Sequence, residues 1–474
     1  MLLAATLCAV AAAQEPPLPE GMKPRSDEPA LPQGMGSPLP STGGEPPLPS
    51  TSDEPPLPQT TDAPPRETGP GLVLPFDLAG FWEARLGLRT QHDKHEKAFS
   101  IAETRLQLEV RKTLDWAQFN LRSDFLYDPV LNRNGIDLEK GAGNIDLREA
   151  NVSFRPLGFL DVKAGRQILT WGTGDMLFIN DLFPKDWNSF FIGRDQEYLK
   201  APSDALKVSI FTAAANLDVV YTPKFDADRF IDGRRLSYYN HTLMRRAGRN
   251  AVVHADRPED CFEDDELALR LSHYFGGIEA AAYAYHGFWK SPGGMDPVTG
   301  KATFPELSVY GASVRGPVGK GIGNIEVGYY DSREDRNGDD PFVRNSEFRA
   351  LVGYEQEIAQ NFTGGVQYYL EHIMDYRALR RASPPGAKDP DEDRHVFTLR
   401  LTRLLMAQNL RLSFFAYYSP SDQDAYLRPN AHYKVNDHWS VETGANLFFG
   451  KRDHTFFGQF EKNNNVYAGA RYSF

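Results

Sequence analysis

The chain has 474 residues, a net charge of −12, 41% hydrophobic residues, 34 prolines and two cysteines. Its mean hydropathy of −0.48 and the lack of a run of about 18 apolar residues exclude a protein that crosses a membrane with helices. The acidic balance argues against nucleic-acid binding, which normally needs a basic surface. Two cysteines are too few for a disulfide framework or a structural zinc site.

The first thirteen residues predict an export signal. Met1 to Ala13 are apolar and end in Ala11-Ala12-Ala13, the small-residue pattern that precedes a cleavage site. The basic residues that usually come before the apolar stretch are missing. A lipid-attachment site at Cys8 and a cytosolic N-terminus are the alternatives, but we expect residues 1–13 to be a signal peptide.

Residues 14–75 predict a disordered tether. About half of the prolines lie between Gln14 and Pro70, where the unit Glu-Pro-Pro-Leu-Pro recurs at Glu15, Glu45 and Glu54. Proline fixes φ and removes a backbone donor, so polyproline II is expected rather than helix or sheet. The segment is a semi-rigid periplasmic spacer or a repeated docking site for a periplasmic partner.

From Phe76 onward, apolar and polar residues alternate with a period of two. Trp82, Ala84 and Leu86 lie on one face of the first such segment, and Glu83 and Arg85 lie on the other. Segments of about ten residues are long enough to cross a bilayer as tilted strands. The expected strands are 76–91, 99–114, 116–129, 143–156, 159–173, 204–215, 216–225, 264–276, 277–290, 304–316, 321–332, 343–359, 361–374, 394–407, 409–419, 425–436, 438–450 and 463–474.

The connections between these strands point to a membrane barrel. Those after even-numbered strands are short, whereas long ones at 174–203, 226–263, 291–303, 333–342 and 375–393 lie at the other end. Outer-membrane barrels alternate short periplasmic turns with long outer loops. We therefore expect residues 76–474 to form an all-β, transmembrane antiparallel β-barrel of about 18 strands in a bacterial outer membrane, with both termini periplasmic.

The C-terminal strand supports this interpretation. Tyr472 and the terminal Phe474 lie on its apolar face. A last strand that ends in Phe resembles the assembly signal of Gram-negative outer-membrane proteins, so the resemblance implies the barrel assembly machinery as a partner.

A barrel near eighteen strands is too wide to be filled by its own strand side chains, so a charged, water-filled lumen is expected. The charges predicted to line it on the first three strands are Arg85, Arg89, Arg105, Arg111 and Arg122, with Glu83, Glu103, Glu109 and Asp124. They either neutralise one another as cross-strand ion pairs or form a ladder of opposed charges that orients solutes. The near balance of sign leaves ion selectivity open.

The long connection at 174–203 is the most informative segment. Residues 175–191 are rich in aromatics, lack strand alternation and have room for a short helix. This connection either folds into the lumen as a constriction or caps the surface through Trp171, Trp187, Phe190 and Phe191. A constriction would place these charges at its narrowest point: Asp175, Asp181, Lys185, Asp186, Arg194 and Lys200.

The same region carries a family resemblance. Gly165-Arg166-Gln167, then Trp171-Gly172, then the stretch from Asn180 to Asp186 resemble the outer-membrane porin-like proteins of the alginate-export and related proteobacterial families. The resemblance covers about residues 163–200. It implies a monomeric barrel that moves polysaccharide, organic solutes or lipid-like molecules. The mixed charge of the predicted lumen does not match a strongly basic alginate tunnel.

The long connection at 226–263 is rich in arginine and is either a solvated loop or a contact with lipopolysaccharide phosphates. Its arginines are Arg229, Arg234, Arg235, Arg245, Arg246 and Arg249. Outer-membrane lipid and lipopolysaccharide are therefore expected partners, and nucleic acid is not. No catalytic motif, cofactor site or convincing metal site is found in the sequence.

Three functions follow from these observations. The favoured one is a porin or export channel that passes polar or organic solutes through a charged lumen narrowed by the loop at 174–203. The second is a barrel sheath or scaffold for a periplasmic or electron-transfer partner. The third, an outer-membrane enzyme or adhesin, lacks a recognisable catalytic or ligand-binding constellation, so we do not expect an enzyme.

Overall fold

The computed structural model describes residues 75–131, 135–138 and 141–474. The predicted signal peptide at 1–13 and the predicted tether, up to residue 74, lie outside the described residues. No helix in the described part of the chain is long and apolar enough to cross a membrane.

Eighteen antiparallel strands form one closed sheet. Each strand pairs with its neighbours in the chain, and the last strand returns to the first through a register that runs from Phe81 opposite Ser473 to Arg89 opposite Asn465. The strands are β1 (Asp77–Arg89), β2 (Phe99–Thr113), β3 (Gln118–Tyr127), β6 (Ile145–Leu157), β7 (Leu160–Ile168), β8 (Pro202–Phe211), β9 (Asn216–Thr222), β12 (Glu266–Phe275), β13 (Ile278–Phe288), β16 (Glu306–Val318), β17 (Gly321–Ser332), β18 (Glu347–Ala359), β19 (Phe362–Ile373), β20 (Asp393–Leu405), β21 (Leu410–Ser419), β22 (Asp424–Lys434), β23 (Trp439–Gly450) and β24 (Asn465–Ser473). The predicted eighteen-stranded barrel is confirmed.

The remaining elements are short and belong to the connections. They are β4 (Ile136–Asp137), β5 (Ala142–Gly143), β10 (Tyr238–Asn240), β11 (Arg245–Ala247), β14 (Gly294–Met295), β15 (Ala302–Thr303), the helices α1 (Trp187–Ile192) and α2 (Tyr376–Ala382), and the 3-10 turns η1 (Gln196–Leu199) and η2 (Gly458–Asn463).

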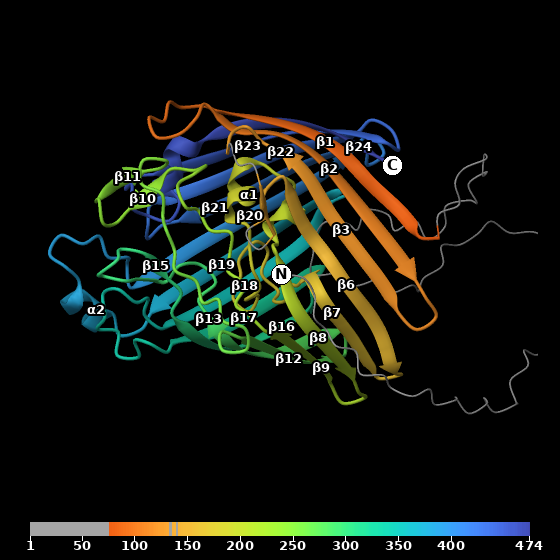
Figure 1. Cartoon of the computed structure of the whole chain (residues 1–474), viewed down its shortest axis with the longest axis horizontal. Coiled ribbons are helices and arrows are strands. Elements are labelled where there is room, and N and C mark those ends of the chain that lie inside the picture. Colours follow the sequence, from red (N-terminus) through yellow and green to blue (C-terminus); the bar gives the residue numbers. More distant parts are fainter. Residues whose placement is uncertain (1–74, 132–134, 139–140) are drawn as a thin grey trace, which may run out of the picture. The chain divides into compact units, whose positions relative to one another are not determined.

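The two ends of the barrel differ, as the alternation of connection lengths predicts. The connections after β2, β6, β8, β12, β16, β18, β20 and β22 are short turns. The turn between β12 and β13 consists of Gly276 and Gly277, whose φ angles of 57° and 82° suit a two-residue hairpin. Figure 1 shows the short turns gathered at one end and the irregular segments with β10, β11 and α2 at the other. An exception is the connection at 420–423, which is short although it lies at the long-loop end. The N-terminal end of β1 and the C-terminal end of β24 both lie at the short-turn end of the barrel.

The strands alternate between an exposed apolar face and a buried polar face. On β1, Trp82 and Leu86 are exposed, whereas Glu83 and Arg85 are buried. The other strands repeat the pattern, so the polar face is the inner face of the barrel. Most of the buried apolar side chains also lie inside, where aromatic residues of the connections pack against inward-facing residues of the strands.

Candidate functional site in the lumen

The segment 169–201, which joins β7 to β8, lies against the inner face of the barrel. Its hydrogen bonds reach inward-facing side chains of β1, β2, β6, β17, β19, β20, β21, β22 and β24. These strands belong to opposite walls of the closed sheet. The segment therefore crosses the lumen, and its aromatic side chains pack inward rather than forming the surface cap that the sequence left open as an alternative. It also contains a short helix, α1, in the stretch where the sequence leaves room for one.

Glu326 of β17 holds the first part of this segment. It is fully buried, and each of its carboxylate oxygens accepts hydrogen bonds from the segment. Oε2 accepts from the backbone N–H of Thr173 at 2.7 Å, from the Thr173 hydroxyl at 3.0 Å and from the N–H of Gly174 at 3.1 Å. Oε1 accepts from the backbone N–H of Asn180 at 2.8 Å and from its side-chain amide at 3.0 Å. One carboxylate thus closes residues 173–180 into a loop fixed to the wall.

Asp175 attaches the same loop to two further strands. Its carboxylate forms an ion pair with Arg400 of β20. Its backbone N–H donates to Gln367 Oε1 of β19 at 2.8 Å, and its carbonyl accepts from Gln367 Nε2 at 2.9 Å. The side chain of Asp175, predicted at the constriction, is therefore ion-paired to the barrel wall.

Helix α1 packs its aromatic residues into the core of the lumen. Phe191 is 2% exposed and lies 5.1 Å from the ring of Phe448 and 5.2 Å from that of Tyr426. Phe190 contacts Tyr426 at 5.7 Å between ring centres. Asp186 caps the N-terminus of the helix, because its carboxylate accepts from the Ser189 N–H at 2.8 Å. Packing and capping together fix the helix inside the barrel.

Two acidic residues follow α1 and differ in their electrostatics. Burial alone would raise the pKa of Asp195, but Arg471, whose Nη2 lies 3.1 Å from the carboxylate, holds it below its ordinary value. Burial and the neighbouring Asp195 raise the pKa of Glu197. The Oε1 atom of Glu197 has no hydrogen-bond partner in the described residues and lies 3.9 Å from Arg471 Nη2, too far for a hydrogen bond. An ionised Glu197 is therefore costly in this position.

The predicted charges on β1 to β3 face inward and are mostly paired. Arg105 contacts Glu103 at 2.7 Å and also pairs with Asp124. Arg85 contacts Glu83 at 3.1 Å. The other predicted charges contact one another or residues beyond the first three strands: Arg111 with Glu109 at 2.8 Å, Arg122 with Glu149 of β6, and Arg85 with Glu442 of β23 at 2.6 Å. Arg89 differs, because it donates to the backbone carbonyls of Lys97, Phe99 and Arg235.

Three residues predicted at the narrowest point are instead buried supports. Lys185 Nζ lies 2.9 Å from Asp181 and donates to the carbonyl of Phe183 at 2.7 Å. Asp181, Lys185 and Asp186 are 5%, 3% and 4% exposed. Their side chains are buried within the core and are not exposed to the lumen.

The other two predicted constriction residues also contact the wall. Arg194 pairs with Glu103 of β2, and the carbonyl of Lys200 accepts from Arg148 at 2.7 Å. Arg148 is the extra residue of a bulge in β6, because Arg122 faces Glu149 while the next pair is Ser123 with Leu147. The alternation in the sequence does not reveal this bulge.

The arginine-rich connection after β9 is largely neutralised by carboxylates. The pairs are Arg229 with Asp146 and Asp186, Arg234 with Asp232, Arg235 with Asp128, Arg246 with Glu461, and Arg249 with Glu96. Burial alone would lower the pKa of Arg229, but Asp146 raises it above its ordinary value. These contacts favour a structural role over an open phosphate site.

The C-terminal residues complete the closure of the sheet. Phe474 exchanges two backbone hydrogen bonds with Gly80, at 3.0 and 3.2 Å. The Tyr472 ring lies 5.2 Å from Trp439 on the outer face. Within the described residues, no three potential metal ligands come together.

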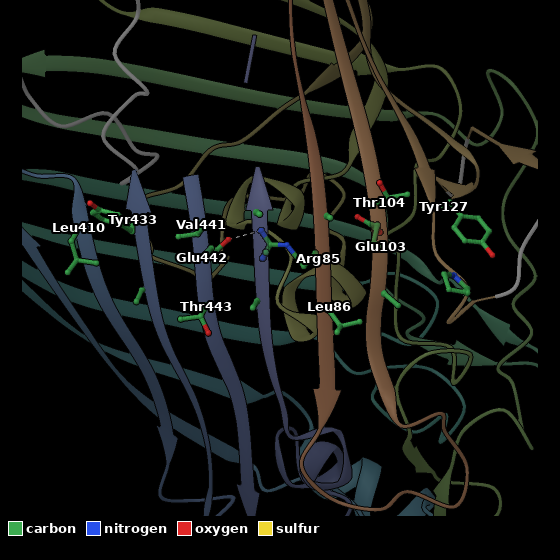
Figure 2. Close-up of a pocket in the computed structure, with 17 residues that line it drawn as sticks. Arg85, Leu86, Glu103, Thr104, Tyr127, Leu410, Tyr433, Val441, Glu442 and Thr443 are labelled. Carbon is green, nitrogen blue, oxygen red and sulfur yellow. Dashed lines mark hydrogen bonds and ion pairs between the residues drawn. The ribbon is translucent and has the colours of Figure 1, made fainter. Parts of the chain in front are cut away.

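A groove of about 750 Å³ crosses the outer face from β21 to β3 (Figure 2). Its floor consists of small outward-facing side chains, among them Ala84, Ala102 and Ala470. Figure 2 also shows Arg85 and Glu442, the inward-facing ion pair behind this floor. The groove is thus part of the apolar outer surface and is separate from the lumen.

Comparison with known proteins gives structural neighbours but no family. No family model matches the chain, and no curated protein matches it. Among solved structures, OccD3 of Pseudomonas aeruginosa is 10% identical with a TM-score of 0.47 over 86% of this chain and 96% of its own. OmpTdeltaL8, a loop-deletion mutant of an outer membrane protein of Vibrio cholerae, is 12% identical with a TM-score of 0.39 over 85% of this chain and 100% of its own. A triple mutant of the Rh. blastica porin is 10% identical with a TM-score of 0.36 over 84% of this chain and 100% of its own. The resemblance to the alginate-export families stays a prediction.

Proposed function

We propose that the chain is an outer-membrane channel that passes polar or organic solutes through a charged lumen narrowed by the loop at 174–203. The observation that carries the proposal is a closed barrel with an apolar outer face, a charged inner face and one connection that crosses the interior.

The height of the apolar outer face supports a membrane location. On β1 the exposed apolar side chains run from Leu78 to Leu88. Ten residues of antiparallel strand span about 34 Å along the strand. At the usual tilt of about 40°, this becomes about 26 Å along the barrel axis, close to the apolar band of about 25 Å in outer-membrane barrels. Exposed Trp116, Phe159 and Trp439 lie near the short turns, as in an aromatic girdle.

The crossing segment favours a channel over a sheath. A sheath needs an interior wide enough for a second polypeptide, whereas residues 169–201 and their aromatic core occupy the long-loop half of the lumen. A narrowed channel requires only that water and small solutes pass beside the segment. Asp175 and Arg194, which are fixed to β20 and β2, mark two positions on the wall of the proposed constriction.

The proposed orientation places the short turns and both termini in the periplasm, because outer-membrane barrels have their short turns on that side. The assembly machinery would then recognise Phe474 from the periplasmic side. The outer face would contact outer-membrane lipid and lipopolysaccharide, and the Pro-rich segment would extend into the periplasm as a spacer or as a docking site for a partner.

Liposome swelling tests the proposal. Vesicles that contain the full-length protein should swell in isotonic polar solutes, at a rate that falls with solute size. A loop-shortened variant in which two glycines replace residues 175–191 should admit larger solutes. A wild-type protein that is correctly inserted but leaves the vesicles impermeable to every solute would contradict the proposal.

A further inference from the structure

Three inward-facing arginines on neighbouring strands surround a small polar patch of the lumen wall. Arg400 of β20 and Arg428 of β22 both lie opposite Phe415 of β21. One inward-facing row further along, Thr402, Ser413 and Asn430 lie side by side, and Arg411 of β21 occupies the next row. Inward rows are about 6.8 Å apart and neighbouring strands about 4.8 Å apart. The long arginine side chains therefore reach the space above the polar row.

That space is a cavity of about 80 Å³ below the crossing segment. It is lined by the three arginines, by Thr402, Ser413 and Asn430, and by Met176 of the segment. Its size suits one small charged group rather than a whole sugar or peptide. The patch is thus a small site on the lumen wall.

The balance of charge around the cavity is positive. Four arginines line it, Arg194, Arg400, Arg411 and Arg428, against two carboxylates, Asp195 and Glu442. Asp195 lies 3.1 Å from Arg471 and also interacts electrostatically with Arg411, and Glu442 lies 2.6 Å from Arg85. Arg194, which also lines the cavity, pairs with Glu103.

Of the three arginines Arg400, Arg411 and Arg428, the first pairs with Asp175. Arg428 contacts Met176 Sδ at 3.5 Å and lies 4.3 Å from the ring centre of Phe190. No ion pair joins Arg428 to a carboxylate in the described part of the chain. Its guanidinium is therefore held in place by sulfur and aromatic contacts while its charge faces the cavity.

We propose that Arg400, Arg411 and Arg428 form a subsite for the anionic group of a solute, a carboxylate or a phosphate, during passage through the lumen. Guanidinium groups bind such groups through paired charge-assisted hydrogen bonds, and the Ser413 and Thr402 hydroxyls supply further donors. This inference rests on the proposed channel function and adds the class of solute.

Ion selectivity and block in planar bilayers test the subsite. The full-length protein is studied with a KCl gradient, and acetate and inorganic phosphate are added as separate probes. Wild type should prefer anions and should be blocked by at least one probe. Arg428→Gln should lower the anion preference and weaken the block by about tenfold, which corresponds to about 1.4 kcal/mol. Arg428→Lys keeps the charge and should retain most of the block.

Arg403→Gln is the matched control, because Arg403 lies on β20 with the opposite parity to Arg400 and donates to the Gln360 carbonyl at 2.8 Å. It should behave as wild type. An Arg428→Gln channel that conducts with unchanged reversal potential and unchanged block would overturn the subsite, as would a wild type blocked by neither anion. The relative strength of the two blocks identifies a carboxylate or a phosphate solute. A wild type that does not conduct at all contradicts the channel instead.

Discussion

Replacing Glu326 by Gln tests whether one buried carboxylate holds the crossing segment in place. The amide substitutes a donor for one of the two oxygens, so that two or three of the five hydrogen bonds from residues 173–180 are lost. Hydrogen bonds to charged groups contribute about 1.5–3 kcal/mol each. Loss of two bonds therefore costs the docked position of this loop about 3–6 kcal/mol.

Other contacts of the loop remain, including those of Asp175 with Arg400 and Gln367. We therefore expect the loop to detach transiently rather than permanently. Single-channel recordings of Glu326→Gln should show larger or noisier conductance than wild type, and the thermal unfolding temperature should fall.

Glu279→Gln is the control, because Glu279 also faces the lumen but pairs with Arg270 and has no hydrogen bond to the segment. An unchanged conductance trace for Glu326→Gln, together with unchanged stability, would refute the anchoring role. An equal effect of Glu279→Gln would show that any lumen carboxylate acts alike.

Four further predictions concern other contacts. In a double-mutant cycle of Asp175→Asn and Arg400→Gln, thermal or denaturant unfolding should give a coupling energy of about 1 kcal/mol or more; additive effects would contradict the pair. The pKa of Glu197 is raised in the folded protein, so its ionisation destabilises the fold as the pH rises through that pKa. Glu197→Gln should therefore raise the unfolding temperature at pH 8 but not at pH 4. An equal effect at both pH values would contradict the raised pKa. Phe191→Ala, at a buried aromatic contact, should destabilise the barrel by about 3–5 kcal/mol in denaturant, whereas a loss below about 1 kcal/mol would disprove its place in the core. Cys261 is exposed in the connection between β9 and β12 at the long-loop end. It should react with a membrane-impermeant maleimide on intact cells. Labelling only after disruption of the outer membrane would contradict the proposed orientation.

The barrel could be predicted from the sequence because its determinants are local. The alternation of Trp82 and Leu86 with Glu83 and Arg85 repeats in each strand, and it reports directly which face is buried. The parity of short and long connections then gives the closed antiparallel order. Both the alternation and the parity can be recognised in the sequence without knowledge of any long-range contact.

The lumen was less predictable because its contacts join distant parts of the chain. Glu326 is an ordinary inward-facing residue of β17 in the sequence, and its partners lie about 150 residues earlier. Asp181 and Lys185 look like solvent-facing charges until the aromatic residues around them are seen to fold inward. Arg428 and Ser413 acquire their role only from the register of β21 with β22.

The proposed function requires the described barrel to conduct. Single-channel recording of the full-length wild-type protein in a planar bilayer tests it most directly. We expect stable, stepwise conductance at neutral pH in KCl, with a preference for anions. A folded, inserted protein that never conducts under any voltage would contradict it.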